Sequence, residues 1–154
     1  MISQNAILEV IEPKLKELDL FLVDLHIGNG NQIRIEVDSL GPFNVDHCVK
    51  INRCFEAAFD REDEDYALEV SSPGLDQGFK VWPQYQKNVG REVEIILNNG
   101  EKRVGMLIKA ENQKIELEKT ERKKIEGTKK KEWVTTRSEF ELKDIKKATV
   151  KLSF

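Results

Sequence analysis

The chain has 154 residues, of which 39% are hydrophobic and 34% are charged, and it carries a formal net charge of −3. This composition is typical of a foldable, water-soluble protein, and the absence of any apolar run near the roughly 18 residues that span a bilayer excludes a membrane-spanning chain. The N-terminus also lacks the basic segment and apolar run of a secretory signal, so we expect a cytoplasmic protein.

Charge is divided unevenly along the chain. Residues 1–80 contain 7 Lys and Arg against 16 Asp and Glu, whereas residues 81–154 contain 18 against 12. The two parts therefore carry net charges of −9 and +6, an asymmetry that favours contact between one of them and a polyanion. A Ser-Ser-Pro-Gly breaker lies close to the charge step. We therefore predict an acidic N-terminal domain over 1–80 and a basic C-terminal domain over 81–154, with a linker at about 77–81.

The first predicted element is an amphipathic helix near the N-terminus. Apolar residues from Ile7 to Leu18 recur with a period of 3.6 residues, and Ser3 is a suitable N-cap. Inside this pattern, Pro13 removes a backbone donor and crowds a carbonyl of the preceding turn. We therefore expect either a kinked helix or a shorter one that starts near Glu12.

Two strands, a second helix and a third strand follow. Apolar residues alternate over 20–27 and 33–37 around a Gly-Asn-Gly turn, which predicts an antiparallel hairpin. Apolar spacing over 48–59 predicts the helix, and alternation over 66–70 predicts the third strand. The order α-β-β-α-β indicates a three-stranded sheet with helices on one face. In the first strand, simple alternation places four residues on one face: Phe21, Val23, Leu25 and Ile27.

The second part of the chain predicts a small β-barrel. Five short apolar runs with brief turns between most of them are typical of an SH3-like or Sm-like barrel, so the whole chain is predicted to be α+β. A long polar excursion over 119–137 separates the third run from the fourth. The five runs lie at 92–97, 104–108, 115–117, 140–142 and 148–154, the last of them carried by Ala148, Val150, Leu152 and Phe154.

The excursion is strongly basic. Residues 119–131 hold seven positive and two negative side chains, and an aromatic residue follows closely. Cations that meet phosphates release counterions, and an exposed aromatic ring can stack on a base, so this composition predicts RNA contact. The alternative is an edge hairpin whose lysines prevent aggregation. The predicted RNA-binding residues are Lys119, Arg122, Lys123, Lys124, Lys129, Lys130, Lys131, Trp133 and Arg137.

The sequence gives little support to catalysis. His26 and His47 have no His/Cys cluster at zinc spacing around them, and Cys48 follows His47 on a predicted helix, where adjacent side chains diverge by about 100°. The acidic run 60–65 lacks the glycine and ligand spacing of a calcium loop, and is either a solvated helix exit or a docking surface for a basic partner. We expect a protein that is not an enzyme, with no cofactor, no metal site and no small-molecule substrate.

The segment between the two parts carries a distinctive motif. An alternating strand runs into a Pro-Gly turn in nine consecutive residues: Leu68, Glu69, Val70, Ser71, Ser72, Pro73, Gly74, Leu75 and Asp76. This stretch resembles the signature of the ribosome maturation factor RimP family. Two flanking stretches, Asp38 to Cys48 and Val89 to Val93, are also similar to the family's pattern. Where the family commonly continues with Arg-Pro-Leu, this chain has Gln77-Gly78-Phe79.

The resemblance implies a fold and a role. It implies an N-terminal α/β domain, a C-terminal SH3-like or Sm-like barrel, and a cytoplasmic, non-catalytic part in maturing the small ribosomal subunit. The implied partners are small-subunit rRNA and a ribosomal protein, and we expect a basic ribosomal protein to meet the acidic domain of a monomer. The turn residues Ser71, Ser72 and Pro73-Gly74 are interpreted as structural, with anion binding by exposed turn amides as the alternative.

Two other functions are considered. An Sm-like RNA-binding module that acts on regulatory RNA, as a ring, would need exposed edge strands that pair between subunits, which the charged excursion would obstruct. A metal-dependent nuclease would need clustered carboxylates, whereas the acids of the first part lie on several predicted elements.

Overall fold

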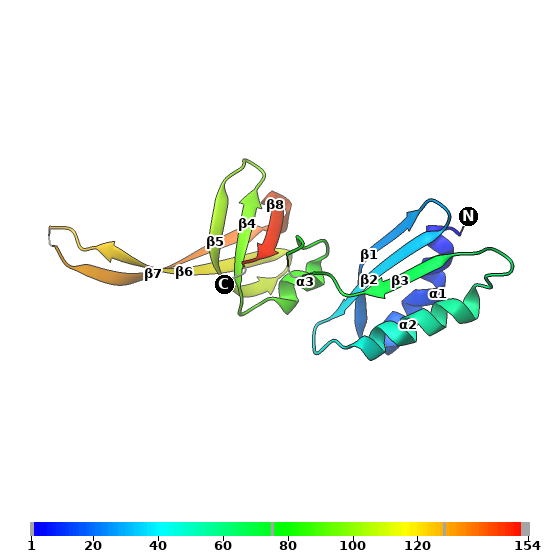
Figure 1. The fold of residues 1–154 in the computed structure, drawn as a ribbon. Helices are drawn as coiled ribbons and strands as arrows, with labels where there is room; N and C mark the ends of the chain where they lie inside the picture. The colour runs from blue at the N-terminus through cyan, green and yellow to red at the C-terminus, as the bar shows by residue number, and fades with distance from the viewer. Residues whose placement is uncertain (1, 75, 128, 152–154) are drawn as a thin grey trace. The chain divides into compact units, whose positions relative to one another are not determined.

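The computed structural model describes residues 2–74, 76–127 and 129–151. The chain divides into two compact units, Met1–Gly74 and Leu75–Phe154, and each is described by itself. The N-terminal unit combines helices with a three-stranded sheet, and the C-terminal unit is built on a five-stranded antiparallel sheet (Figure 1). The predicted α+β class is therefore confirmed.

The N-terminal unit has the predicted α-β-β-α-β order. Its elements are α1 (Gln4–Glu17), β1 (Leu20–Gly28), β2 (Gln32–Ser39), α2 (Val45–Ala58) and β3 (Ala67–Ser71). The sheet order is β1-β2-β3, with β1 antiparallel and β3 parallel to β2. The parallel pair requires a crossover between its two strands, and α2 provides it.

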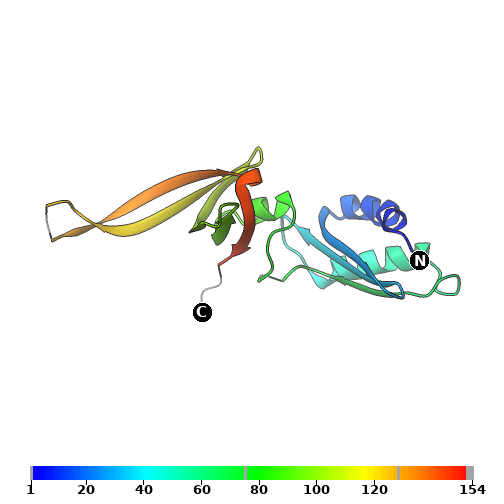
Figure 2. The same cartoon turned by 90° about the horizontal axis from the view of Figure 1, so that it is seen from above.

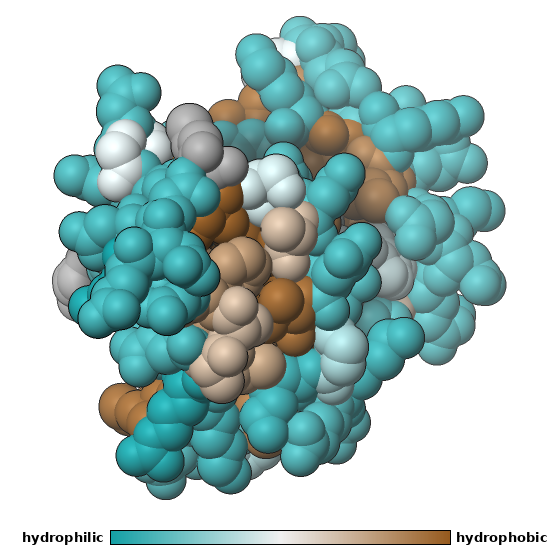
Figure 3. All heavy atoms as spheres, turned by 90° about the vertical axis from the view of Figure 1, so that its right-hand side faces the viewer, coloured by the Kyte–Doolittle hydropathy of each residue, from teal (hydrophilic) through white to brown (hydrophobic). Residues whose placement is uncertain are grey.

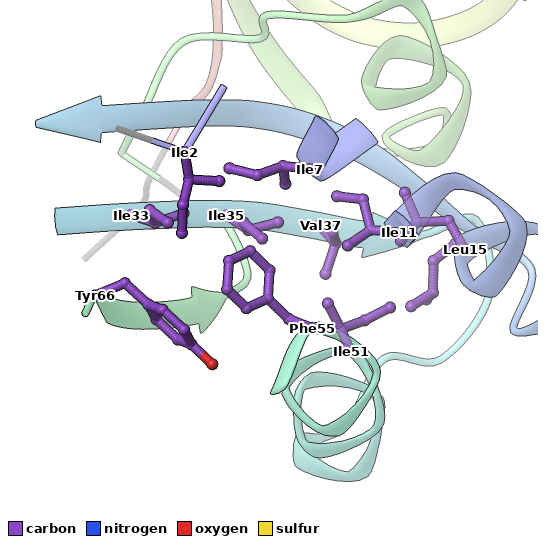
Figure 4. Packing of buried hydrophobic residues seen from close by; sticks show 11 residues of the cluster. Ile2, Ile7, Ile11, Leu15, Ile33, Ile35, Val37, Ile51, Phe55 and Tyr66 are labelled. Carbon is purple, nitrogen blue, oxygen red and sulfur yellow. The ribbon is translucent and has the colours of Figure 1, made fainter. Parts of the chain in front are cut away.

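Both helices lie on the same face of this sheet (Figures 1 and 2). Side chains from the helices and the strands meet in one core between the two layers (Figure 4). The members of this core that are completely buried are Ile7, Ile11, Ile35, Val37, Ile51 and Phe55. Burial of one such side chain stabilises a fold by about 1.5–3 kcal/mol, so this layer holds the unit together. In the view of Figure 3, hydrophilic side chains cover most of the surface and flank a central band of hydrophobic ones.

Helix α1 is longer than predicted. It runs from Gln4 to Glu17 through Pro13, so the expected late start near Glu12 is wrong. The predicted cap is confirmed, because the Oγ of Ser3 accepts a hydrogen bond from the N–H of Ala6 at 3.2 Å. The ring of Pro13 is exposed, on the side of the helix away from the core, where a carbonyl that loses its helical partner meets water.

A β-bulge in β1 changes which residues face the helices. The register of β1 against β2 shifts between Leu22 and Asp24. The prediction that Phe21 and Val23 share the core face is therefore wrong, because an extra residue in one strand reverses the faces of the residues that follow it. The β1 side chains in the helix-facing core come from both sides of the bulge: Leu20, Leu22, Leu25 and Ile27.

The C-terminal unit begins with a short helix and continues as a sheet. Its elements are α3 (Trp82–Lys87), β4 (Glu92–Leu97), β5 (Lys102–Glu111), β6 (Lys114–Lys124), β7 (Lys131–Glu141), the 3-10 helix η1 (Leu142–Asp144) and β8 (Ile145–Val150). The sheet order is β7-β6-β5-β4-β8, and each neighbouring pair is antiparallel. In the described part of the chain β7 and β8 are the edges, so the sheet is not closed and the predicted barrel stays a prediction. The predicted strand residues Leu152 and Phe154 lie outside the described residues.

An aromatic cluster packs α3 onto the second core. The ring of Tyr85 meets that of Phe79 edge to face, with centroids 4.9 Å apart, and stacks on that of Trp82 at 5.6 Å. The backbone N–H of Phe79 also donates to the carbonyl of Ala148 at 2.8 Å. Although Phe79 falls in the range predicted as a linker, its contacts therefore belong to the C-terminal unit.

Candidate nucleic-acid interface

The basic excursion is a two-stranded ribbon. Strands β6 and β7 pair continuously from Lys114 opposite Glu141 to Lys124 opposite Lys131, whereas β5 pairs with β6 only as far as Glu118. Figures 1 and 2 both show the ribbon extending beyond the remainder of its sheet. Both strands of the ribbon therefore present their side chains to solvent, without a core on either side.

Directly opposed residues of an antiparallel pair lie on the same face, so the register assigns every ribbon residue to one of two faces. We call them the Trp133 face and the Lys123 face. The Trp133 face holds four facing pairs: Glu118 with Arg137, Thr120 with Thr135, Arg122 with Trp133, and Lys124 with Lys131. The Lys123 face holds the alternate pairs: Lys119 with Thr136, Glu121 with Val134, and Lys123 with Glu132.

The structure gathers some of the predicted RNA-binding residues and separates others. Lys119 and Lys123 lie on the Lys123 face, while Lys129 and Lys130 are exposed in the turn that joins the strands. Thr128 in this turn lies outside the described residues. The Trp133 face brings together the remaining five: Arg122, Lys124, Lys131, Trp133 and Arg137.

An arginine–tryptophan contact lies in the middle of the Trp133 face. The guanidinium carbon of Arg122 is 5.6 Å from the centroid of the Trp133 ring. Such cation–π contacts at exposed sites are worth about 0.5–1 kcal/mol, enough to favour one orientation of the ring. Trp133 is nevertheless 70% exposed. The guanidinium thus covers one side of the indole, and the other side remains open to solvent.

Hydroxyl groups and an ion pair flank this contact towards the sheet. The Oγ1 atoms of Thr120 and Thr135 are 3.0 Å apart and share a hydrogen bond. One pair further on, the Nε of Arg137 donates to the Oε2 of Glu118 at 3.2 Å. Sequence reasoning did not select the two threonines. Their pairing follows from the register of β6 against β7, which no local pattern in residues 119–136 indicates.

A backbone hydrogen bond spans the turn at the end of the ribbon. The N–H of Ile125 donates to the carbonyl of Lys130 at 3.0 Å, and Gly127 has a φ of 79°. A residue with a side chain rarely adopts that conformation, so glycine is the residue that suits this turn. The turn thereby holds Lys129 and Lys130 next to the cations of both strands, and positive charge is concentrated at the tip.

The RimP-like motif spans the end of the N-terminal unit. Leu68 and Val70 pack against the helix-facing core, and the carboxylate of Glu69, on the other face of the sheet, lies 3.7 Å from the Nε of Arg34. Ser71 ends β3, Ser72 and Asp76 are exposed, and Leu75 lies outside the described residues. The first half of the motif is therefore structural, whereas the roles of the turn residues stay predictions.

The His47 side chain caps α2 and is not directed at Cys48 as a base. The Nδ1 of His47 accepts a hydrogen bond from the N–H of Asn44 at 3.2 Å, which places the imidazole in the N-terminal cap of α2. Burial raises the pKa of the Cys48 thiol, which disfavours the thiolate that a nucleophile requires. Within the described residues, no three His, Cys, Asp or Glu side chains are grouped as a metal ion would need.

The acidic run after α2 forms a turn in which aspartate side chains accept hydrogen bonds from nearby backbone N–H groups. The Oδ1 of Asp60 accepts a hydrogen bond from the N–H of Glu62, and that of Asp65 accepts one from the N–H of Tyr66, both at 2.9 Å. The guanidinium of Arg61 lies 4.7 Å from the Tyr66 ring centroid. These contacts fit the interpretation as a helix exit, and docking of a basic partner here stays a prediction.

Comparison with known proteins places the chain among relatives of one name. Residues 10–76 match the family model described as the RimP N-terminal domain. The ribosome maturation factor RimP of Porphyromonas gingivalis strain W83 is 36% identical over 148 residues, which cover 96% of this chain and 97% of the relative. The protein of the same name from Christiangramia forsetii is 36% identical over 138 residues, 88% of each chain. None of the helices in the described residues has the length and apolar character needed to cross a membrane. The chain belongs to the ribosome maturation factor RimP family.

Proposed function

We propose that this protein binds the immature small ribosomal subunit in the cytoplasm, through rRNA and a basic ribosomal protein, and assists its assembly without catalysing a reaction. Family membership and the printed name of its relatives support the role in ribosome maturation. A protein without an energy source acts on assembly by preferring one conformation of its partner, so binding would stabilise a local rRNA conformation.

The observation that carries the RNA contact is the concentration of positive charge on the ribbon. Residues 119–131 hold seven cations and two acids, and Lys129, Lys130 and Lys131 are all exposed at the tip. Neutralisation of phosphates by closely spaced cations releases counterions, which makes such contacts strong at low salt and weaker as salt rises.

The N-terminal unit supplies the second contact in this proposal. Residues 1–80 have a net charge of −9, which is complementary to a basic ribosomal protein. Opposite potentials on two parts of one chain favour a single orientation on a surface where RNA and cationic protein lie side by side.

We further assign the C-terminal unit to the SH3-like or Sm-like barrel class. Four of its strands contribute buried residues to a single core and Phe140 of β7 packs against it, which supports the assignment because the sheet of a small barrel encloses its own interior. The strand residues in this core are Val93 and Ile95 of β4, Leu107 and Ala110 of β5, Ile115 and Leu117 of β6, and Ala148 of β8. The chain is expected to act as a monomer, so light scattering should give a mass near 17.8 kDa, whereas a hexamer or heptamer would favour the ring-forming alternative.

Neutralisation of the ribbon tip tests the proposal. The triple variant K129Q/K130Q/K131Q should lose co-sedimentation with immature small subunits at physiological salt. A matched variant, K146Q/K147Q/K151Q, removes the same charge from exposed positions at β8 and just after it, and should retain binding. Unchanged association of the first variant, or equal binding of the wild-type protein to immature and mature subunits, would contradict the proposal.

A further inference from the structure

We propose that the Trp133 face of the ribbon is a platform for one unpaired RNA base, stacked on Trp133, and for the phosphates beside it. The inference deepens the proposed function: it takes RNA as the partner and identifies the face, the ring and the cations that bind it. The Lys123 face has no part in this contact.

Charge separates the two faces. Beyond the Glu118–Arg137 ion pair, the Trp133 face carries three cations and no acid, from Arg122, Lys124 and Lys131. On the Lys123 face two lysines are balanced by two glutamates, Glu121 and Glu132. The Nζ of Lys119 already lies 3.8 Å from the Oε2 of Glu121. The surplus positive charge of the two strands is therefore confined to the side that carries the tryptophan.

The lysine pair at the end of this face destabilises the strand pairing, and no ion pair within the described residues compensates for it. Lys124 and Lys131 are directly opposite each other, and like charges in that position destabilise a strand pair. Neither lysine forms an ion pair with a described residue, and both are exposed. A bound phosphate would remove the repulsion, since one anion between two ammonium groups attracts both of them.

The tryptophan is likewise unexplained by folding. Its ring is 70% exposed and does not belong to the core of the C-terminal unit. A large aromatic surface held by Arg122 on one side and open on the other has the geometry on which bases stack in proteins that bind single strands. Stacking requires a base whose flat face is free, so the ligand is an unpaired segment of RNA instead of a continuous duplex.

The pieces of the platform are spaced on the scale of a nucleotide. Lys124 and Lys131 lie two residues along their strands from Arg122 and Trp133, which corresponds to about 6.5 Å. On the other side, the hydroxyls of Thr120 and Thr135 lie at the same strand spacing; one O–H is used in the bond between them, and the other supplies a donor for a phosphate or a ribose hydroxyl. A base on the ring thus has polar partners for its backbone on both sides.

Tryptophan fluorescence of the full chain tests the stacking. The chain holds two tryptophans, so W82F, which keeps an aromatic ring in the half-buried position against Tyr85, makes Trp133 the sole reporter. A single-stranded RNA decamer should quench this fluorescence, and a blunt duplex of the same sequence should bind at least tenfold more weakly. Without the reporter change, W133A should lose about tenfold or more in affinity, measured by anisotropy of a labelled decamer, and W133F should recover most of it. Equal binding of duplex and single strand, or an unaltered affinity of W133A, would overturn the inference.

Paired charge variants test the sidedness. K124Q/K131Q and K119Q/K123Q remove the same charge from the two faces of one ribbon. At 0.15 M salt the first should weaken binding of the decamer by about tenfold and the second by no more than about twofold, because screening limits the effect of charges that do not touch the ligand. Circular dichroism confirms that each variant is folded. Equal losses from the two variants would refute a one-sided site.

The two proposals fail in distinguishable ways. If wild-type protein co-sediments with immature subunits but shows neither quenching nor a difference between the faces, the platform is wrong and the proposed function stands. If the decamer binds on one face but the protein does not associate with subunits, the platform stands and the proposed function is wrong.

Discussion

Asn44 and His47 bond each other twice at the start of α2. The Oδ1 of Asn44 accepts from the N–H of His47 at 3.3 Å, while the Nδ1 of His47 accepts from the N–H of Asn44 at 3.2 Å. This is a capping box in which histidine occupies the position usually held by Glu or Gln. The ring of Phe43 also lies 5.3 Å from the imidazole. The N–H of His47 also donates to the carbonyl of Asn44 at 3.2 Å, so this donor is shared between the backbone and the side chain of one residue, and the N–H of Asn44 is satisfied by the imidazole.

Loss of this cap should destabilise the N-terminal unit. N44A removes the side-chain acceptor and is expected to lower the free energy of unfolding by about 1 kcal/mol in urea titrations. H47Q keeps an acceptor at the same position of the box and should cost less. If both variants unfolded at the wild-type denaturant concentration, the reciprocal bonds would have no energetic weight.

Phe79 should anchor the chain to the C-terminal unit. Its ring is half-buried and meets Tyr85 edge to face, so F79A should lower the stability of that unit by about 2 kcal/mol, less than the 3–5 kcal/mol typical of a fully buried ring. F79L places the residue that the family commonly has here and should cost less than about 1.5 kcal/mol. Thermal unfolding followed by near-ultraviolet circular dichroism measures both, and wild-type behaviour of F79A would mean that residues 77–81 are a simple linker.

Gly105 of β5 lies close to the backbone of the neighbouring strand β6. A Cβ atom at this buried position would stand 3.0 Å from the carbonyl oxygen of Glu118 and 3.3 Å from the Cβ of Leu117. Because a backbone atom cannot move aside cheaply, G105A should destabilise the C-terminal unit by about 1–3 kcal/mol. G100A tests a different effect, since that glycine has a φ of 90° in an open turn and only the backbone conformation is strained. A G105A protein as stable as wild type would show that the two strands separate without cost.

Cys48 should react slowly with alkylating reagents. Burial raises the pKa of its thiol above the ordinary value, so the folded protein keeps the proton at a pH where the unfolded chain has lost it. Stability from this group is therefore present below the pKa of the unfolded thiol and declines as the pH rises above it. In a C54S background, the rate of iodoacetamide labelling at pH 8 should fall below that of an unstructured cysteine peptide. A faster rate would indicate an activated thiol.

Local periodicity predicted the order of elements in the N-terminal unit well, because each helix buries one face and the apolar residues of the strands largely alternate. The order of elements and the cap at Ser3 followed from short patterns. The bulge between Leu22 and Asp24 did not, since a single extra residue leaves no mark in the composition of a strand. Helix α3 was also missed, because six residues are too few to establish a period of 3.6.

The sequence predicted which basic and aromatic residues belong to the candidate interface, but not which face of the ribbon each of them lies on. A count of charges located the basic segment and Trp133. The segment lacks a core, so alternation of apolar residues could not reveal that it continues β6 and β7. Only the register of the two strands showed that Lys119 and Lys123 lie on one face of the ribbon and that Arg122 and Trp133 lie on the other. The threonine pair depends on the same long-range alignment, since its members are 15 positions apart along the chain.

Strand pairing without a core gives the ribbon an unusual freedom to change length. Deleting two residues from each strand would remove one facing pair from each face of the ribbon. All the remaining side chains would keep their orientation. Deleting one from each would invert all the side chains between the cut and the hairpin end, since orientation alternates at every step. Homologous ribbons of different length should accordingly differ by an even number of residues per strand. An odd difference is expected only where a bulge restores the original orientation of the side chains.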